Sequence, residues 1–409
     1  MEQSTLKVYG YRWVMLLVYM FVVAMNQLLW ITFASITSDA ASFYRVSDLS
    51  IGILSLSFMI VFIIVSIPAS WAIDTYGIRA AVGLGAALTG IFGLLRGVFA
   101  SDYNLVLIAQ IGIAVGQPFI LNAVTAVAAR WFPMRERATA SGLGSLAIFL
   151  GIIAGLALTP YLTIQAGIGN MLVAYGVVSI IAAIVFFALA RERPPTPPCP
   201  PDQEARSLVL DGLKQILRQR NFGILLFVFF VGLGLFNAVT TWIEDIVRPR
   251  GFSITQAGII GGVMVLGGVI GALVIPELSD RYRRRVPFLI LALVGAIPGL
   301  IDITLATGYW LLLVSAFVLG FFLLSAAPVG FQYGAEVAYP APEGTSNGLL
   351  LLMGQISGII FIFGMDSFRS PGTGAMTQPL IGLIGLMVVS LLLTTRLEES
   401  TLLTGNATS

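Results

Sequence analysis

Residues 49–79 read LSIGILSLSFMIVFIIVSIPASWAIDTYGIR, and this stretch decides the fold class. No charged residue occurs from Leu49 to Ile73. A helix needs about 20 consecutive apolar residues to cross the hydrocarbon core of a bilayer. The run ends at a short polar segment that contains Asp74 and Arg79, and another apolar run follows. The pattern predicts a membrane-spanning helix, a tight loop and a second membrane-spanning helix.

The rest of the chain repeats this pattern. Of its 409 residues 57% are hydrophobic and 10% charged, and the mean hydropathy is +0.95. Soluble domains contain about 25% charged residues, so the composition excludes a soluble enzyme, a nucleic-acid binder, a disulfide scaffold and a disordered chain. The apolar runs are continuous rather than alternating, which excludes a β-barrel. We predict an all-α membrane protein with twelve transmembrane helices, near 12–36, 49–72, 78–100, 103–129, 138–160, 168–190, 222–247, 254–276, 286–306, 309–335, 344–366 and 376–397.

One long polar interruption divides the chain. It is rich in proline and contains the single cysteine, Cys199. We therefore predict an N-terminal six-helix half at 1–190, a cytoplasmic linker at 191–221 and a C-terminal six-helix half at 222–409. Within the linker, a short amphipathic stretch from Leu208 to Leu217 is expected to lie along the membrane surface.

The positions of lysine and arginine predict the orientation. With the amino terminus inside, 17 of the 22 basic residues fall on the cytoplasmic side. Because basic residues concentrate in cytoplasmic loops, both termini and the linker are expected in the cytoplasm and the chain in the plasma or inner membrane. The net charge of +2 then reflects insertion into the lipid bilayer and indicates no nucleic-acid partner.

An internal repeat relates the two halves. Three elements recur at a constant offset of 206 residues: Asp74 with Asp280, Gly93 with Gly299, and Gly142 with Gly348. Two six-helix halves related by an axis along the membrane normal form a transporter architecture, with the substrate bound between the halves. The repeat therefore predicts two pseudo-symmetric halves and a small-molecule substrate.

The loops after the second and eighth spans carry a recognisable pattern. They contain Asp74 and Arg79 in the first half, and Asp280 and Arg281 in the second. These loops resemble the signature of the major facilitator superfamily, although Thr75 stands where the signature has an arginine. The resemblance implies a cytoplasmic gate formed by these four charged residues, in which carboxylates near helix amino termini hold the cations nearby.

Further sequence motifs indicate a resemblance to one family within this superfamily. They include Pro68-Ala69-Ser70-Trp71-Ala72-Ile73-Asp74, Gln117-Pro118-Phe119-Ile120-Leu121 and Glu343-Gly344-Thr345-Ser346-Asn347-Gly348-Leu349-Leu350. Together they are similar to the feline leukaemia virus subgroup C receptor-related family, solute carrier family 49. Members of that family are multi-span facilitators associated with choline and ethanolamine, and historically with haem. The resemblance implies the same fold and substrate class.

The family's choline pocket maps onto this sequence at four positions. Its tryptophan falls on Trp30, and its two glutamines fall on Gln117 and Gln355. Its tyrosine position is Asn237 here, so one aromatic wall is missing. The resemblance therefore implies substrate contacts by Trp30, Gln117 and Gln355, with Asn237 as a departure that puts choline itself in question.

The polar residues of the spans give a second route to the site. Asn26 and Trp30 are four residues apart and share a helix face. Lipid cannot hydrogen-bond to a polar side chain, so such groups turn toward the bundle or a cavity. Near the outer end of the seventh span, Trp242 and Glu244 are candidates for attracting a cation. The amide side chains could instead form interhelical hydrogen bonds that only pack the bundle. Glu244 could instead belong to a solvated helix end with Arg248 nearby.

Arg96 is expected at the outer interface as an anchor, about 25 Å beyond Arg79 at 1.5 Å per residue. No lysine or arginine falls in the middle of a span, so the predicted cavity has no fixed cation and suits a cationic, zwitterionic or neutral solute. The chain has no histidine, so haem ligation, metal binding and a histidine general base are not expected. We expect no metal, cofactor or enzymatic activity.

The predicted function is secondary transport of a choline- or ethanolamine-like solute by alternating access. Uniport is favoured because the acidic residues near the membrane all fall close to span ends. Two alternatives stay open, a proton-coupled exporter of drugs or organic ions and a non-transporting receptor or sensor. We expect a monomer.

Overall fold

The computed structural model describes residues 8–196, 219–338 and 343–399, and these residues form helices and connecting turns. The stretch from Leu208 to Leu217 and Cys199 lie outside the described residues. The chain divides into two compact units, Met1–Arg206 and Ser207–Ser409. The helices of the first unit are α1 (Tyr11–Ile31), α2 (Thr37–Tyr44), α3 (Asp48–Tyr76), α4 (Ile78–Val98), α5 (Tyr103–Leu121), α6 (Val124–Trp131) and α7 (Met134–Leu189). Those of the second are α9 (Arg220–Thr241), α10 (Ile243–Val247), α11 (Ile254–Tyr282), α12 (Val286–Leu305), α13 (Tyr309–Ala338), α14 (Glu343–Ser367) and α15 (Thr377–Thr394).

The membrane spans agree with the predicted number. Among the described residues, 11 helical segments are long and apolar enough to cross a membrane. One of them, Thr139–Leu189, has 51 residues, more than twice the length that crosses about 30 Å of hydrocarbon. Its backbone leaves the helical region at Gly167, where φ is +81°, so α7 consists of two spans. The prediction of an all-α fold with twelve transmembrane helices is confirmed.

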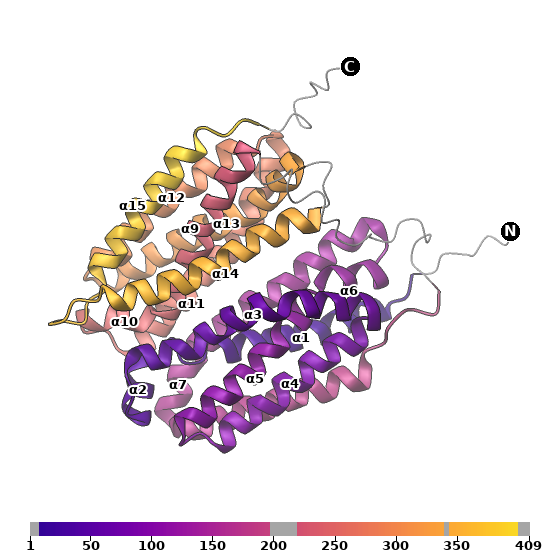
Figure 1. Cartoon of the computed structure of the whole chain (residues 1–409), viewed down its shortest axis with the longest axis horizontal. Coiled ribbons are helices and arrows are strands. Elements are labelled where there is room, and N and C mark those ends of the chain that lie inside the picture. The colour runs from indigo at the N-terminus through magenta and orange to yellow at the C-terminus, as the bar shows by residue number, and fades with distance from the viewer. Residues whose placement is uncertain (1–7, 197–218, 339–342, 400–409) are drawn as a thin grey trace. The chain divides into compact units, whose positions relative to one another are not determined.

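Each unit is a bundle of helices that pack lengthwise (Figure 1). In the first unit α7 packs along α1 and α4, and α4 also packs along α5. In the second unit α13 packs along α11 and α12, while α9 packs along α14. This packing brings α1, α4 and α5 together, and α1 and α5 carry the predicted substrate residues of the first unit, Asn26, Trp30 and Gln117.

The sequence repeat reappears in the structure. Both α3 and α11 have 29 residues, and their bounds differ by the same 206 positions as the sequence motifs. Ser47 and Ser253 cap the two helices, each accepting a hydrogen bond from the backbone N–H three residues later. The residue that follows each helix has a positive φ, +90° at Gly77 and +51° at Arg283. The positive φ turns the chain sharply into the next span, a geometry that glycine adopts without the steric cost that a side chain brings.

Candidate substrate and gate sites

The carboxyl-terminal part of α1 holds Asn26 and Trp30, both of which are buried. The Asn26 amide donates a hydrogen bond to Thr89 Oγ1 of α4 at 3.1 Å. The Trp30 indole N–H donates to the carbonyl oxygen of Ser55 on α3, also at 3.1 Å. The polar edges of both side chains are therefore satisfied within the first unit. The π face of Trp30, rather than its N–H, is the part of this side chain that can contact a solute.

Two glutamines of α5 differ in their hydrogen bonding. Gln110 accepts a hydrogen bond from Arg96 at 2.7 Å and donates to the Leu29 carbonyl at 3.2 Å. The Gln117 side chain is 6% exposed and makes no hydrogen bond with any residue that the structure describes. A buried amide inside a membrane protein needs a partner. Gln117 is thus the amide of α5 that can accept or donate a hydrogen bond to a solute.

Arg96 corrects an expectation. Its side chain is fully buried and does not anchor the unit at an interface. The guanidinium donates to the Leu29 carbonyl, to Gln110 Oε1 and to Thr32 Oγ1, at 3.0, 2.7 and 3.2 Å. Residue spacing correctly placed Arg96 near the end of α4 but could not show that its side chain points inward against α1 and α5. Arg96 is therefore a cation buried within the first unit, in the last turn of α4.

In the second unit Asn237 joins two helices. Its amide donates to the Gly354 carbonyl at 3.2 Å, which links α9 to α14. Gln355 follows in the chain, and its half-buried side chain has no hydrogen-bond partner among residues 8–196, 219–338 and 343–399. The predicted pair Asn237 and Gln355 therefore lies in one neighbourhood, where Gln355 has the open amide and Asn237 serves packing.

Trp242 and Glu244 lie in an ionic cluster. The Trp242 indole N–H donates to the Ile362 carbonyl at 3.1 Å, and the Arg369 guanidinium lies 5.3 Å from a Trp242 ring centroid. Glu244 is 2% exposed and pairs with Arg248 at 3.2 Å. Glu244 lies just beyond the end of α9 at Thr241, in the separate short helix α10, which begins at Ile243. Its carboxylate is already neutralised by a protein cation.

The gate motif of the second unit centres on Arg285, which the sequence analysis missed. Arg285 forms an ion pair with Asp280 and another with Glu336 at 3.1 Å. Burial acts to lower the pKa of Arg285, but the bonds to Asp280 and Glu336 outweigh it and raise the pKa above its ordinary value. The predicted Arg281 is exposed. The turn at Arg283 reverses the chain, so Arg285 rather than Arg281 meets Asp280.

A carboxylate caps the span that follows each gate loop. Glu192 accepts from the backbone N–H groups of Ile78 and Arg79 at the start of α4. Glu399 accepts from those of Arg285 and Val286 at the start of α12. Helix amino termini favour negative charge, which explains both contacts. The two glutamates stand 207 positions apart, one more than the repeat offset of 206, which matches Glu192 with Glu398 instead.

The predicted gate residues of the first unit, Asp74 and Arg79, stand on either side of the turn between α3 and α4. The side chains of Asp74 and Arg79 are both exposed, and no ion pair joins them within the described part of the chain. Glu192 pairs instead with Arg130. The interaction that connects helices here is thus Glu192 with Arg130 and the start of α4, and Asp74 remains available.

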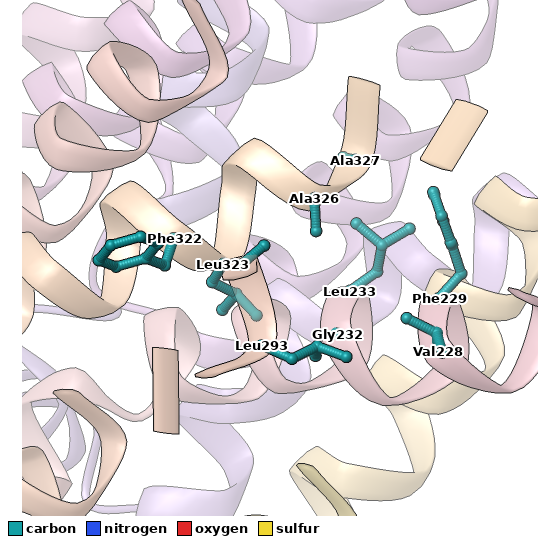
Figure 2. A pocket seen from close by; sticks show the side chains of 10 residues that line it. Val228, Phe229, Gly232, Leu233, Leu293, Phe322, Leu323, Ala326 and Ala327 are labelled. Atoms are coloured by element: carbon teal, nitrogen blue, oxygen red, sulfur yellow. The ribbon is translucent and has the colours of Figure 1, made fainter. Parts of the chain in front are cut away.

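Two hollows in the second unit contain none of the predicted substrate residues. A cavity of about 20 Å³ lies among apolar side chains of α9, α12 and α13, including Phe229, Leu293 and Phe322. Figure 2 shows the side chains that line it. The cavity has room for about one water molecule but offers that water no polar side chain. A larger groove of about 400 Å³ runs between α14 and α15 and is mostly apolar. Neither hollow carries the polar groups that orient a small charged solute.

The fold and the gate loops together define a class of protein. The family model of the Major Facilitator Superfamily matches residues 15–362, and the chain belongs to this superfamily. It is therefore a multi-pass membrane transporter with a small-molecule substrate. Solved structures support the fold: a bacterial homolog of the human lysosomal transporter Spinster has a TM-score of 0.70 at 17% identity, covering 95% of this chain and 96% of that one. The nucleoside transporter NupG gives 0.70 at 15% identity, covering 94% and 99%.

The curated relatives narrow the class. Solute carrier family 49 member A3 of Xenopus tropicalis is 31% identical over 391 residues, which cover 90% of this chain and 80% of that protein. The human choline/ethanolamine transporter FLVCR2 is 27% identical over 381 residues, covering 88% of this chain and 72% of that protein. Within the superfamily, the chain belongs with solute carrier family 49, as its sequence motifs predicted.

Proposed function

We propose that this protein carries a small organic ammonium compound of the choline and ethanolamine class across its membrane. The observation that carries the proposal is the pair of open amides, Gln117 and Gln355. Each sits in a membrane span and has no hydrogen-bond partner among the residues that the structure describes. Choline and ethanolamine both carry a hydroxyl group that such amides can bind. The relatives named as choline/ethanolamine transporters support the substrate class.

Trp30 is the proposed contact for the ammonium group. A tryptophan ring attracts cations through the negative charge on its face. Because its N–H is held by Ser55, the orientation of this ring is set before a solute arrives. Asn237 offers no aromatic face to the ammonium group. The missing contact weakens the binding of choline more than that of ethanolamine, whose primary ammonium group is smaller. We therefore expect ethanolamine to be preferred over choline.

The proposed mechanism is uniport by alternating access, with the charged residues of the gate loops on the cytoplasmic side. Asp74, Arg79 and Asp280 keep the roles expected from the sequence, and Arg285 replaces Arg281 as the partner of Asp280. Trp242 and Glu244 are proposed only as secondary contacts, since Arg369 and Arg248 already occupy their binding surfaces.

Uptake of radiolabelled ethanolamine and choline into proteoliposomes tests this function. We expect saturable uptake with a strongly raised KM in Gln117→Ala and Trp30→Ala, and with an unchanged KM in Asn170→Ala, an exposed amide of the same unit. Uptake should be indifferent to an imposed pH gradient. If folded protein transports neither compound, the substrate class is wrong. If transport follows the pH gradient, uniport is wrong and proton coupling is correct.

A further inference from the structure

The most unusual group in the first unit is the Arg96 guanidinium. It is fully buried, and no carboxylate pairs with it among the residues that the structure describes. Burying an unpaired charge is costly, so something else must stabilise it. All of its hydrogen-bond acceptors are neutral, and two of the three belong to the end of α1.

The carboxyl terminus of α1 supplies the missing negative charge. Arg96 donates to the Leu29 carbonyl in the last turn of α1 and to the hydroxyl of Thr32, the residue that caps this helix. The last carbonyls of a helix have no partner within it, and the helix dipole makes this end negative. The guanidinium also lies 5.5 Å from the Phe33 ring centroid in the following turn. Arg96 therefore acts as a cap that α4 provides for α1.

The capped carbonyl is part of the peptide bond that precedes Trp30. A peptide unit is planar, so fixing the Leu29 carbonyl also fixes the N–H of Trp30 and the direction in which its chain continues. Gln110 of α5 donates to the same carbonyl, which gives it two donors from two different helices. On the other side, Ser55 of α3 holds the indole N–H. Trp30 is thus held at its backbone by α4 and α5 and at its ring by α3.

We propose that Arg96, together with Gln110, is a positioning residue that sets the orientation of Trp30 for the solute. The inference rests on the proposed role of Trp30 in substrate binding. Only arginine suits the position, because its planar group reaches Leu29, Thr32 and Gln110 at once, whereas a lysine ammonium is a single point. Arg96 does not touch the solute in this arrangement.

Transport kinetics test the proposal through Arg96→Gln and Arg96→Lys. The control Arg45→Gln removes the same charge from an exposed site in the same unit. We expect Arg96→Gln to raise KM for ethanolamine about tenfold, the scale of one cation–π contact, with little change in kcat per folded protein. Arg96→Lys should recover only part of the loss, and Arg45→Gln should match the wild type.

A double variant separates positioning from a merely structural role. If Arg96 acts through Trp30, adding Arg96→Gln to Trp30→Ala should raise KM no further than Trp30→Ala alone. Independent, additive effects on KM would overturn the proposal. So would an Arg96→Gln variant that loses folded protein but keeps a normal KM in the molecules that remain.

A fluorescence measurement tests the positioning role of Arg96 independently of the proposed transport function. The difference in emission between the wild type and Trp30→Phe isolates the fluorescence of Trp30 from that of the other tryptophans. Quenching of this component by acrylamide measures how accessible the Trp30 ring is. We expect quenching of this component to increase in Arg96→Gln and not in Arg45→Gln. If neither ammonium compound is transported but the quenching increases, the substrate class fails and the positioning role stands. Unchanged quenching overturns the positioning role.

Discussion

Each unit places a guanidinium group over an aromatic ring, and the two units balance its charge differently. Arg96 lies 5.5 Å from the Phe33 ring centroid in the first unit, and Arg369 lies 5.3 Å from a Trp242 ring centroid in the second. Arg369 pairs with the buried carboxylate of Asp245 at 3.0 Å. The acceptors of Arg96 are instead a carbonyl, a hydroxyl and an amide.

The difference shows two ways of keeping an arginine inside a membrane protein. In the second unit one carboxylate, Asp245, serves both Arg248 and Arg369, so removing it leaves two cations without that partner. In the first unit the negative carboxyl end of α1 balances the charge of Arg96 through several weaker contacts. The cap of Arg96 thus consists of neutral groups, with no carboxylate paired to it among the described residues.

The largest effect is expected at the shared carboxylate. Asp245→Asn removes the counter-charge of two arginines at a fully buried position and should lower the free energy of unfolding by about 3 kcal/mol. Thermal unfolding of the purified protein in detergent measures this loss. Asp366→Asn is the control, because that carboxylate is partly exposed and 3.5 Å from Arg369, and it should cost about 0.5 kcal/mol. Equal losses would contradict a special role for Asp245.

An intermediate effect is expected at Gln110, where a substitution can give Arg96 a carboxylate partner like the one that Arg369 has in the second unit. Gln110→Leu deprives Arg96 and the Leu29 carbonyl of a partner each and should cost about 2 kcal/mol. Gln110→Glu keeps an acceptor for Arg96 and adds a carboxylate, so it should stay within about 1 kcal/mol of the wild type. Chemical unfolding compares the two. A glutamate as destabilising as the leucine would show that the charge of Arg96 is already fully balanced.

The smallest effects are expected at the two capping glutamates. Glu399→Gln weakens the charge at the start of α12 and should cost about 1 kcal/mol. Glu192→Gln should cost somewhat more, because it also breaks the pair with Arg130. Amide hydrogen exchange in the first turns of α4 and α12 reports both changes locally. Glu398→Gln, at the exposed neighbour of Glu399, should change neither exchange nor stability.

Much of the fold could be predicted because its determinants are local. The length of the uncharged run before Asp74 predicted the second span, and the structure has α3 over Asp48–Tyr76. The constant offset between motifs predicted two similar halves, and α3 and α11 repeat it in their bounds. Each span depends on residues within one helix length, and the repeat depends on short motifs that recur, so a sequence displays both directly.

The candidate site could be predicted only in part. A residue count placed Arg96 near the end of α4, but not the rotation of that helix, which turns the side chain inward. At the gate loop, the pairing of Asp280 with Arg285 depends on the left-handed turn at Arg283, a conformation that arginine seldom adopts. Because α9 ends at Thr241, Glu244 lies on a separate helix, α10. Helical periodicity alone predicts one continuous helix here.

By itself, the sequence determined that this chain spans a membrane twelve times in a repeated pattern and that it is a transporter of its superfamily. Hydrophobic length and composition are enough for the spans, because the bilayer acts on each span separately. The superfamily followed instead from the resemblance of the gate loops and is shown by the family match. Only the tertiary structure decided which polar side chains satisfy one another and which remain open. Arg96 and its partner Leu29 are 67 positions apart, and Asn237 and Gly354 are 117 apart. Such pairs form only when separate helices pack, and their packing left Gln117 and Gln355 without partners in the described residues.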